Sequence, residues 1–136
     1  ETLSLRMQQH TKNAMLVAEY LNQHPKISHV SYAGLKKSKY YKLSKKYFPN
    51  GPGSIFTIRL KKGYNACVSL VEKVTMLSHV ANIGDTRSLI IHPASTTHSQ
   101  LSDEDKIKSG AGPDIVRLSI GIETVEDIIR DLDSAL

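Results

Sequence analysis

Two segments of the chain alternate apolar and polar residues with a period of two, and this pattern restricts the possible folds most strongly. Successive side chains of a strand point to opposite faces, so each segment predicts a strand with one buried face. The fold therefore contains a sheet that packs one side against an apolar layer. The apolar positions are Phe56, Ile58 and Leu60 in the segment 54–60, and Val116, Leu118 and Ile120 in the segment 115–120.

Apolar stripes at helical spacing predict helices that can supply this layer. The first helix runs from near the start of the chain to about Asn22 and is closed by Pro25, a second begins at Gly63, and a third follows Thr124. Ser102 and Thr124 each stand three residues before an acid, the form of a capping box that starts a helix. The stripe of the first helix consists of Leu3, Met7, Ala14, Val17, Ala18 and Leu21.

The remaining segments complete the prediction of the fold class. We expect short strands at residues 27–32, 79–82 and 89–92, and a Lys-rich helix between Gly34 and Phe48. Strands and helices do not alternate strictly, which favours an α+β fold: an α/β two-layer sandwich of a small antiparallel or mixed sheet with helices on one face. The other face of the sheet is expected to be wet or covered by something outside the chain. The length of 136 residues, without repeats, predicts one domain.

Cysteine content and hydropathy bear on the compartment. Cys67 is the only cysteine of the chain, so no internal disulfide can form, and we expect it to be a small buried side chain in a reducing compartment. The sequence has neither an apolar run of about 18 residues nor a charged and then apolar leader. These features predict a cytoplasmic protein that does not associate with membranes.

Basic residues are concentrated in one part of the chain. Ten basic residues and no acid lie between Glu19 and Glu72, and six of these are lysines of the segment 36–46, interleaved with tyrosines. Lysines can neutralise phosphates and tyrosines can stack on bases, so one interpretation is a stand-alone basic binding module for nucleic acid. The segment lacks arginine and a nucleic-acid motif, which favours a solvated surface and no nucleic-acid partner.

Arg117 is the charged residue that the strand pattern singles out. Its guanidinium lies on the face opposite three branched apolar side chains, where it can grip a carboxylate with two parallel hydrogen bonds. An exposed residue or an ion pair with a neighbouring acid explains the same position equally well. The segments 82–88 and 92–98 are rich in hydroxyl and amide groups, which suit a polar ligand or turns. His92 and His98 have no further ligand at metal-binding spacing, so no metal site is expected.

Three runs of residues resemble the C-terminal part of the Cys/Met-metabolism family of pyridoxal-phosphate enzymes. The resemblance implies that residues 1–136 form the C-terminal small domain of a fold-type I enzyme, and that the catalytic, cofactor-binding domain lies outside this chain. The runs are Asn82-Ile83-Gly84-Asp85, His92-Pro93-Ala94-Ser95-Thr96-Thr97-His98, and Val116-Arg117-Leu118-Ser119-Ile120-Gly121-Ile122-Glu123.

Within this family, Asn82 and its neighbours are most similar to the O-acetylhomoserine sulfhydrylase branch. The resemblance implies a transferase of methionine biosynthesis that makes homocysteine and acetate from O-acetylhomoserine and sulfide by γ-replacement. Pyridoxal 5'-phosphate, bound by the absent domain, would act as electron sink. Cystathionine γ-synthase and the methionine or cystathionine γ-lyases remain alternatives within the family.

The resemblance also assigns roles to three residues of this chain. Arg117 is expected to clamp the α-carboxylate of the amino-acid substrate, and Asn82 and Thr97 to lie around that carboxylate or to support Arg117. The Schiff-base lysine of the family has no counterpart here, so no catalytic or cofactor-binding residue is expected and the chain alone should be inactive. The expected partners are its own N-terminal cofactor domain and further copies in a homo-oligomer, a tetramer.

Overall fold

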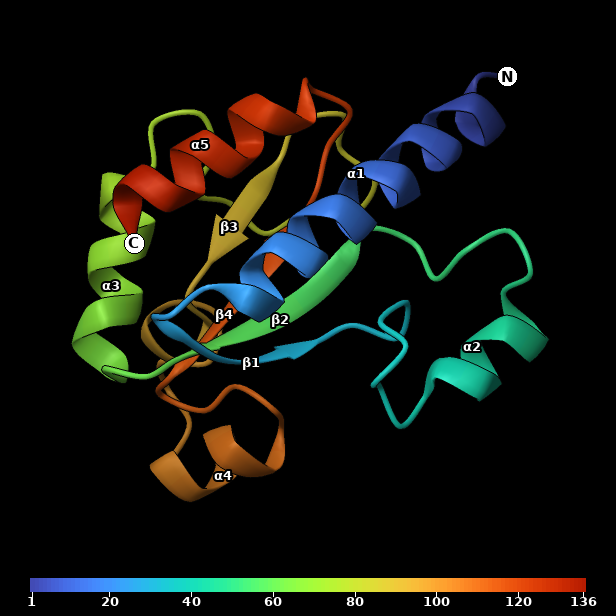
Figure 1. Ribbon diagram of the computed structural model, residues 1–136. Helices are drawn as coiled ribbons and strands as arrows, with labels where there is room; N and C mark the ends of the chain where they lie inside the picture. Colours follow the sequence, from blue (N-terminus) through green and yellow to red (C-terminus); the bar gives the residue numbers. More distant parts are fainter.

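Four antiparallel strands form one sheet in the order β1-β2-β4-β3 (Figure 1). The computed structural model describes residues 1–136. The two strands predicted from alternation are the neighbouring central pair, in which Ile58 is paired with Val116 and Phe56 with Leu118. The strands are β1 (Ile27–Ser31), β2 (Ile55–Leu60), β3 (Leu89–Ile91) and β4 (Ile115–Ser119).

Three helices pack on one face of this sheet, so the predicted two-layer α+β sandwich is confirmed (Figure 1). Their apolar stripes and the apolar face of the strands form one core of 21 buried residues. These helices are α1 (Leu3–Gln23), α3 (Tyr64–Lys73) and α5 (Val125–Ala135). The shorter helices, which stand outside this layer, are α2 (Tyr41–Tyr47), η1 (Pro93–Ser95) and α4 (Asp103–Lys108). None of the helices has the length and apolar content needed to cross a membrane.

Cys67 lies in α3 and is fully buried in the core, as predicted. Its burial raises the pKa of the thiol to about 12. Because the thiolate is the reactive form, this cysteine is a packing residue of low reactivity.

Of the two predicted capping boxes, the one at Ser102 is confirmed in its N-cap bond and the prediction at Thr124 is wrong. Ser102 Oγ accepts a hydrogen bond from the backbone N–H of Asp105 at 3.1 Å, which satisfies a free donor at the start of α4. The Thr124 hydroxyl makes no such bond at the start of α5. There the main-chain oxygen of Thr124 accepts from the N–H groups of Asp127 and Ile128, so the backbone alone begins the helix.

The Lys-rich helix is shorter than predicted, because its first part consists of turns. The N–H of Leu35 bonds to the oxygen of Tyr32, that of Ser38 to Leu35, and that of Tyr41 to Ser38. Each of these bonds joins residues three apart, whereas an α-helix needs partners four apart. The α-helix therefore begins only at Tyr41.

The prediction of a strand at residues 79–82 is wrong, because these residues form no strand. Ser78 forms an isolated parallel bridge with Leu89, and the N–H of Val80 then bonds back to the oxygen of Ser78 at 3.0 Å. The chain turns there, leaves the edge of the sheet and crosses the face opposite the helices. As a result that face, which we expected to be wet or covered from outside, is partly covered by the chain itself: Leu89 and Ile91 are only 2% and 5% exposed.

Candidate carboxylate-binding site

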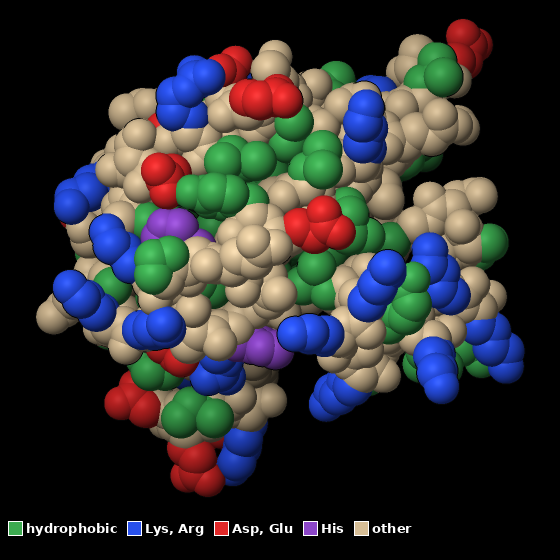
Figure 2. All heavy atoms as spheres, viewed as in Figure 1, with side chains coloured by type: hydrophobic (Ala, Val, Ile, Leu, Met, Phe, Trp, Pro, Cys, Tyr) green, Lys and Arg blue, Asp and Glu red, His purple; other side chains and the backbone are tan.

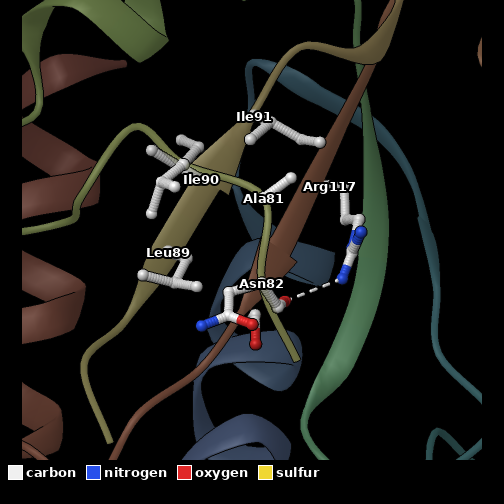
Figure 3. A pocket seen from close by; sticks show the side chains of 8 residues that line it. Ala81, Asn82, Leu89, Ile90, Ile91 and Arg117 are labelled. Carbon is white, nitrogen blue, oxygen red and sulfur yellow. Dashed lines mark hydrogen bonds between the residues drawn. The ribbon is translucent and has the colours of Figure 1, made fainter. Parts of the chain in front are cut away.

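Arg117 occupies the centre of β4, between Thr57 on β2 and Ile91 on β3. Its neighbours Val116 and Leu118 are buried in the helical core, so the period of the strand directs Arg117 to the opposite face. The side chain is half-buried. It points toward the crossing segment that contains Ala81 and Asn82 (Figure 3).

The guanidinium of Arg117 has a main-chain partner and no acidic one. Its Nη2 donates a hydrogen bond to the main-chain oxygen of Asn82 at 3.1 Å, and no carboxylate is paired with it. The remaining N–H groups of its planar fork are therefore available for a carboxylate from outside. Three other arginines already have such partners: Arg59 with Asp114, Arg87 with Asp85, and Arg130 with Asp127.

Asn82 lies directly over Arg117, and its side chain is exposed. Its Oδ1 accepts a hydrogen bond from the N–H of Ile83 at 2.8 Å, and its side chain also interacts with the carboxylate of Asp85. No cavity for water remains between the crossing segment and the sheet. Asn82 and Arg117 thus form one contiguous polar surface rather than the wall of a closed pocket.

Thr97 is not joined to this pair. Its hydroxyl bonds to Nδ1 of His98 at 2.8 Å, and its side chain is exposed.

His92 is buried, with Nδ1 bonded to Ser95 Oγ and Nε2 donating to the main-chain oxygen of Pro113 at 2.8 Å. Burial lowers the pKa of His92, so its ring is neutral at neutral pH. No three His, Cys, Asp or Glu side chains gather as metal ligands.

Ser88, at the end of the loop 82–88, is held by Glu123 and Gly121, two residues for which no pattern in the sequence indicated this role. Glu123 Oε1 accepts from the N–H of Ser88 at 2.6 Å, and Glu123 Oε2 accepts from Ser88 Oγ at 2.9 Å. Ser88 Oγ in turn accepts from the N–H of Gly121 at 2.9 Å. The N–H of Ile122 bonds to the oxygen of Thr86 at 2.9 Å. The loop is therefore tied to the segment that follows β4.

Two polar side chains of α1 hold the same segment from its other side. His10 Nδ1 donates to the main-chain oxygen of Ile120, and Asn13 Nδ2 donates to the oxygens of Gly121 and Glu123 at 3.1 and 2.8 Å. His10 and Asn13 are buried. His10 falls at the apolar spacing of α1, between Met7 and Ala14, so a polar residue on the stripe was a detectable sign of this contact.

Gly121 has room for no side chain, so Gly121→Ala should lower the free energy of unfolding by about 2 kcal/mol. An added Cβ would lie 2.3 Å from the oxygen of Thr86 and 2.6 Å from the carbonyl carbon of Arg87. Both are main-chain atoms, so the loop 82–88 would have to move. Urea unfolding of the chain measures the loss.

Gly112→Ala is the matched control for this substitution. Its added Cβ would meet only the flexible side chain of Asp114 at 3.3 Å and that of Ile115 at 3.5 Å. We expect a change within about 0.5 kcal/mol. Equal losses for the two variants would contradict the steric explanation.

The lysines of the chain lie at its surface. Twelve of them are exposed and Lys106 is half-buried, whereas a lysine that forms a Schiff base needs a desolvated pocket. The lysines of the segment 36–46 gather around α2 (Figure 2), where Lys39, Lys45 and Lys46 lie 4.9–5.6 Å from the ring centres of tyrosines. These rings are therefore already in contact with cations of the chain.

Comparisons with known proteins agree with the fold of the chain. A solved structure, a putative O-acetylhomoserine (thiol)-lyase from Campylobacter jejuni with a pyridoxyl-lysine phosphate, superposes with a TM-score of 0.92 at 43% identity, over 98% of this chain and 32% of that one. An O-acetyl-L-homoserine sulfhydrylase of Thermus thermophilus is 46% identical, and a homocysteine synthase of Schizosaccharomyces pombe 45%, each over 100% of this chain.

The matches cover all of this chain but only part of each relative. The chain spans about one third, 32%, of the length of the two curated relatives. The family model described as Cys/Met metabolism PLP-dependent enzyme matches residues 1–136, the whole of the chain. The chain therefore belongs to the Cys/Met metabolism family of PLP-dependent enzymes.

Proposed function

We propose that this chain is the C-terminal domain of a longer protein, an O-acetylhomoserine sulfhydrylase. This longer protein is the whole protein. The whole protein would make homocysteine and acetate from O-acetylhomoserine and sulfide by γ-replacement. This domain would bind the α-carboxylate of the amino-acid substrate. Relatives at 45–46% identity that are named for this reaction or its product support the choice of substrate over cystathionine and methionine.

The observation that carries the proposal is the unpaired fork of Arg117. A guanidinium with two parallel N–H groups binds a carboxylate with defined orientation as well as affinity. Asn82 holds one edge of the fork through its main-chain oxygen, so its role in the proposed site is to orient Arg117. Thr97 belongs to the proposed site through the family resemblance alone.

The cofactor would be held outside this chain. Pyridoxal 5'-phosphate supplies the electron sink for such chemistry, and the lysines of this domain lack the desolvated setting that its attachment requires. The work of this domain would be to bind and orient the carboxylate at the edge of the active centre.

Exposed apolar residues beside the loop 82–88 mark the surface that the rest of the whole protein would cover. Arg6 Nη1 donates to the oxygen of Gly84 at 3.5 Å, so the first turns of α1 lie beside the loop 82–88. Leu5 and Ile83, next to these two residues, are 70% and 77% exposed. In the whole protein these two side chains would be covered by the domain that lies outside this chain. The proposal also includes a cytoplasmic location and a homotetramer. Light scattering of the whole protein tests the tetramer.

The test of the proposed function is an assay of the whole protein with O-acetylhomoserine and sulfide. We expect homocysteine and acetate to form, and turnover of cystathionine or methionine to be much slower. The chain 1–136 alone is the control, and it should neither bind pyridoxal phosphate tightly nor form homocysteine. Faster turnover of cystathionine or methionine would move the protein to another branch of the family.

A further inference from the structure

We infer that Glu123 is a positioning residue, which holds the loop 82–88 so that the main-chain oxygen of Asn82 orients Arg117. This inference rests on the proposed function and deepens it. Arg117 would contact the substrate carboxylate, whereas Glu123 would act only through the loop.

The carboxylate of Glu123 forms hydrogen bonds only with Ser88, at the end of the loop. Both of its oxygens accept hydrogen bonds from Ser88, one from the backbone N–H and one from the hydroxyl. Hydrogen bonds to a charged acceptor are stronger than those between neutral groups. Ser88 is fully buried, so loss of Glu123 would leave its N–H without a partner away from water.

The main chain of Glu123 is also fixed, so its carboxylate cannot follow a moving loop. Asn13 of α1 donates to the oxygen of Glu123 at 2.8 Å and to that of Gly121 at 3.1 Å. Glu123 lies four residues beyond the end of β4, and β4 contains Arg117. The guanidinium and the anchor of the loop therefore stand on the same rigid base.

The loop has little else to keep it in place. Asn82, Ile83 and Gly84 are exposed, as are Thr86 and Arg87. A segment without buried apolar contacts depends for its order on a few polar bonds. At the Ser88 end these bonds come from Glu123, Gly121 and Ile122. In the middle of the loop Arg6 donates a long bond of 3.5 Å to the oxygen of Gly84, and at the Asn82 end the bond is the one to Arg117. Loosening the first end would free the oxygen that orients the guanidinium.

Hydrogen exchange of the whole protein, read by mass spectrometry, tests the anchoring directly. Glu123→Ala should speed the exchange of the amides in 82–88 about tenfold or more, while the amides of β4 keep their protection. Glu126→Ala is the matched control, because Glu126 is an exposed acid three residues further along. It should leave the exchange of 82–88 unaltered.

Steady-state kinetics of the same variants test the effect on the site. Glu123→Ala should raise the KM for O-acetylhomoserine about tenfold with kcat within about twofold, because the carboxylate would meet a less ordered guanidinium. Glu123→Gln keeps an oxygen that accepts from the N–H of Ser88. The exchange of 82–88 and the KM of this variant should therefore lie close to those of the unaltered protein. Glu126→Gln should behave like the unaltered protein.

The two measurements separate the possible failures. An active enzyme in which Glu123→Ala changes neither the exchange of 82–88 nor KM would overturn the positioning role. Equal loss of protection throughout the domain, together with a fall in kcat, would also overturn it, because Glu123 would then be a general stability residue. A whole protein that loosens at 82–88 but does not turn over O-acetylhomoserine would refute the proposed function and leave the anchoring supported.

Discussion

Arg117→Lys in the whole protein should lower kcat/KM for O-acetylhomoserine by about 5- to 150-fold, equivalent to about 1–3 kcal/mol of lost binding. A lysine presents a single ammonium group instead of a planar fork. It could bond to the oxygen of Asn82 or to a substrate carboxylate, but it could not hold both in one plane. Most of the loss should fall on KM. The measurement is a comparison of steady-state kinetics for the two proteins.

Arg59→Lys provides the control within the same sheet. Arg59 lies on β2, two residues beyond the partner of Arg117, on the same face of the sheet. It is paired with Asp114 at 3.1 Å, and a lysine there can keep that ion pair. We expect kcat/KM to stay within about twofold of the unaltered value. Unchanged kinetics for Arg117→Lys would remove Arg117 from the carboxylate role.

Asp131→Ala should lower the free energy of unfolding by about 3 kcal/mol, or about 10 °C in Tm. The carboxylate of Asp131 on α5 accepts from the N–H groups of Thr75, Met76 and Leu77 and from the hydroxyl of Thr75, at 2.7–3.2 Å. It thereby fixes the connection that follows α3. Removal would leave three backbone donors without this acceptor. Urea unfolding, with the exposed Glu126→Ala as the control on the same helix, measures the difference.

The same carboxylate gives this stability a definite pH dependence. Partial burial acts to raise the pKa of Asp131, but the hydrogen bonds from Thr75, Met76 and Leu77 outweigh it and the pKa is lowered. A lowered pKa in the folded state contributes stability above the unfolded pKa, about 3.9, and this contribution is lost as the pH falls through the folded value. The gap between the unaltered chain and Asp131→Ala should therefore be constant near pH 7 and shrink below about pH 4.

The strands and helices that bury a periodic face were predictable from the sequence. β2, β4 and the three covering helices depend on side-chain spacing alone, and each was found where the period placed it. The errors lie where other contacts decide. A tight turn after Ser78 moves residues 79–82 off the sheet, and turn hydrogen bonds delay α2 to Tyr41. Neither contact changes the local pattern of polar and apolar residues.

The proposed site was predictable in its charged residue and less so in its supports. Arg117 was identified by its strand, and Asn82 by resemblance, and the two are joined in the structure. The contact between Ser88 and Glu123 links residues 35 positions apart. The contact between Asn13 and Gly121 links residues 108 apart. Such pairings follow from how the sheet and α1 come together, which no local spacing encodes.

The bond between Arg117 and position 82 has an evolutionary consequence. The atom that holds the guanidinium is a main-chain oxygen, and every amino acid supplies one. A substitution at position 82 therefore keeps the acceptor that orients Arg117. Under the proposed function, position 82 can accept other side chains in the course of evolution while the guanidinium stays oriented toward the substrate carboxylate.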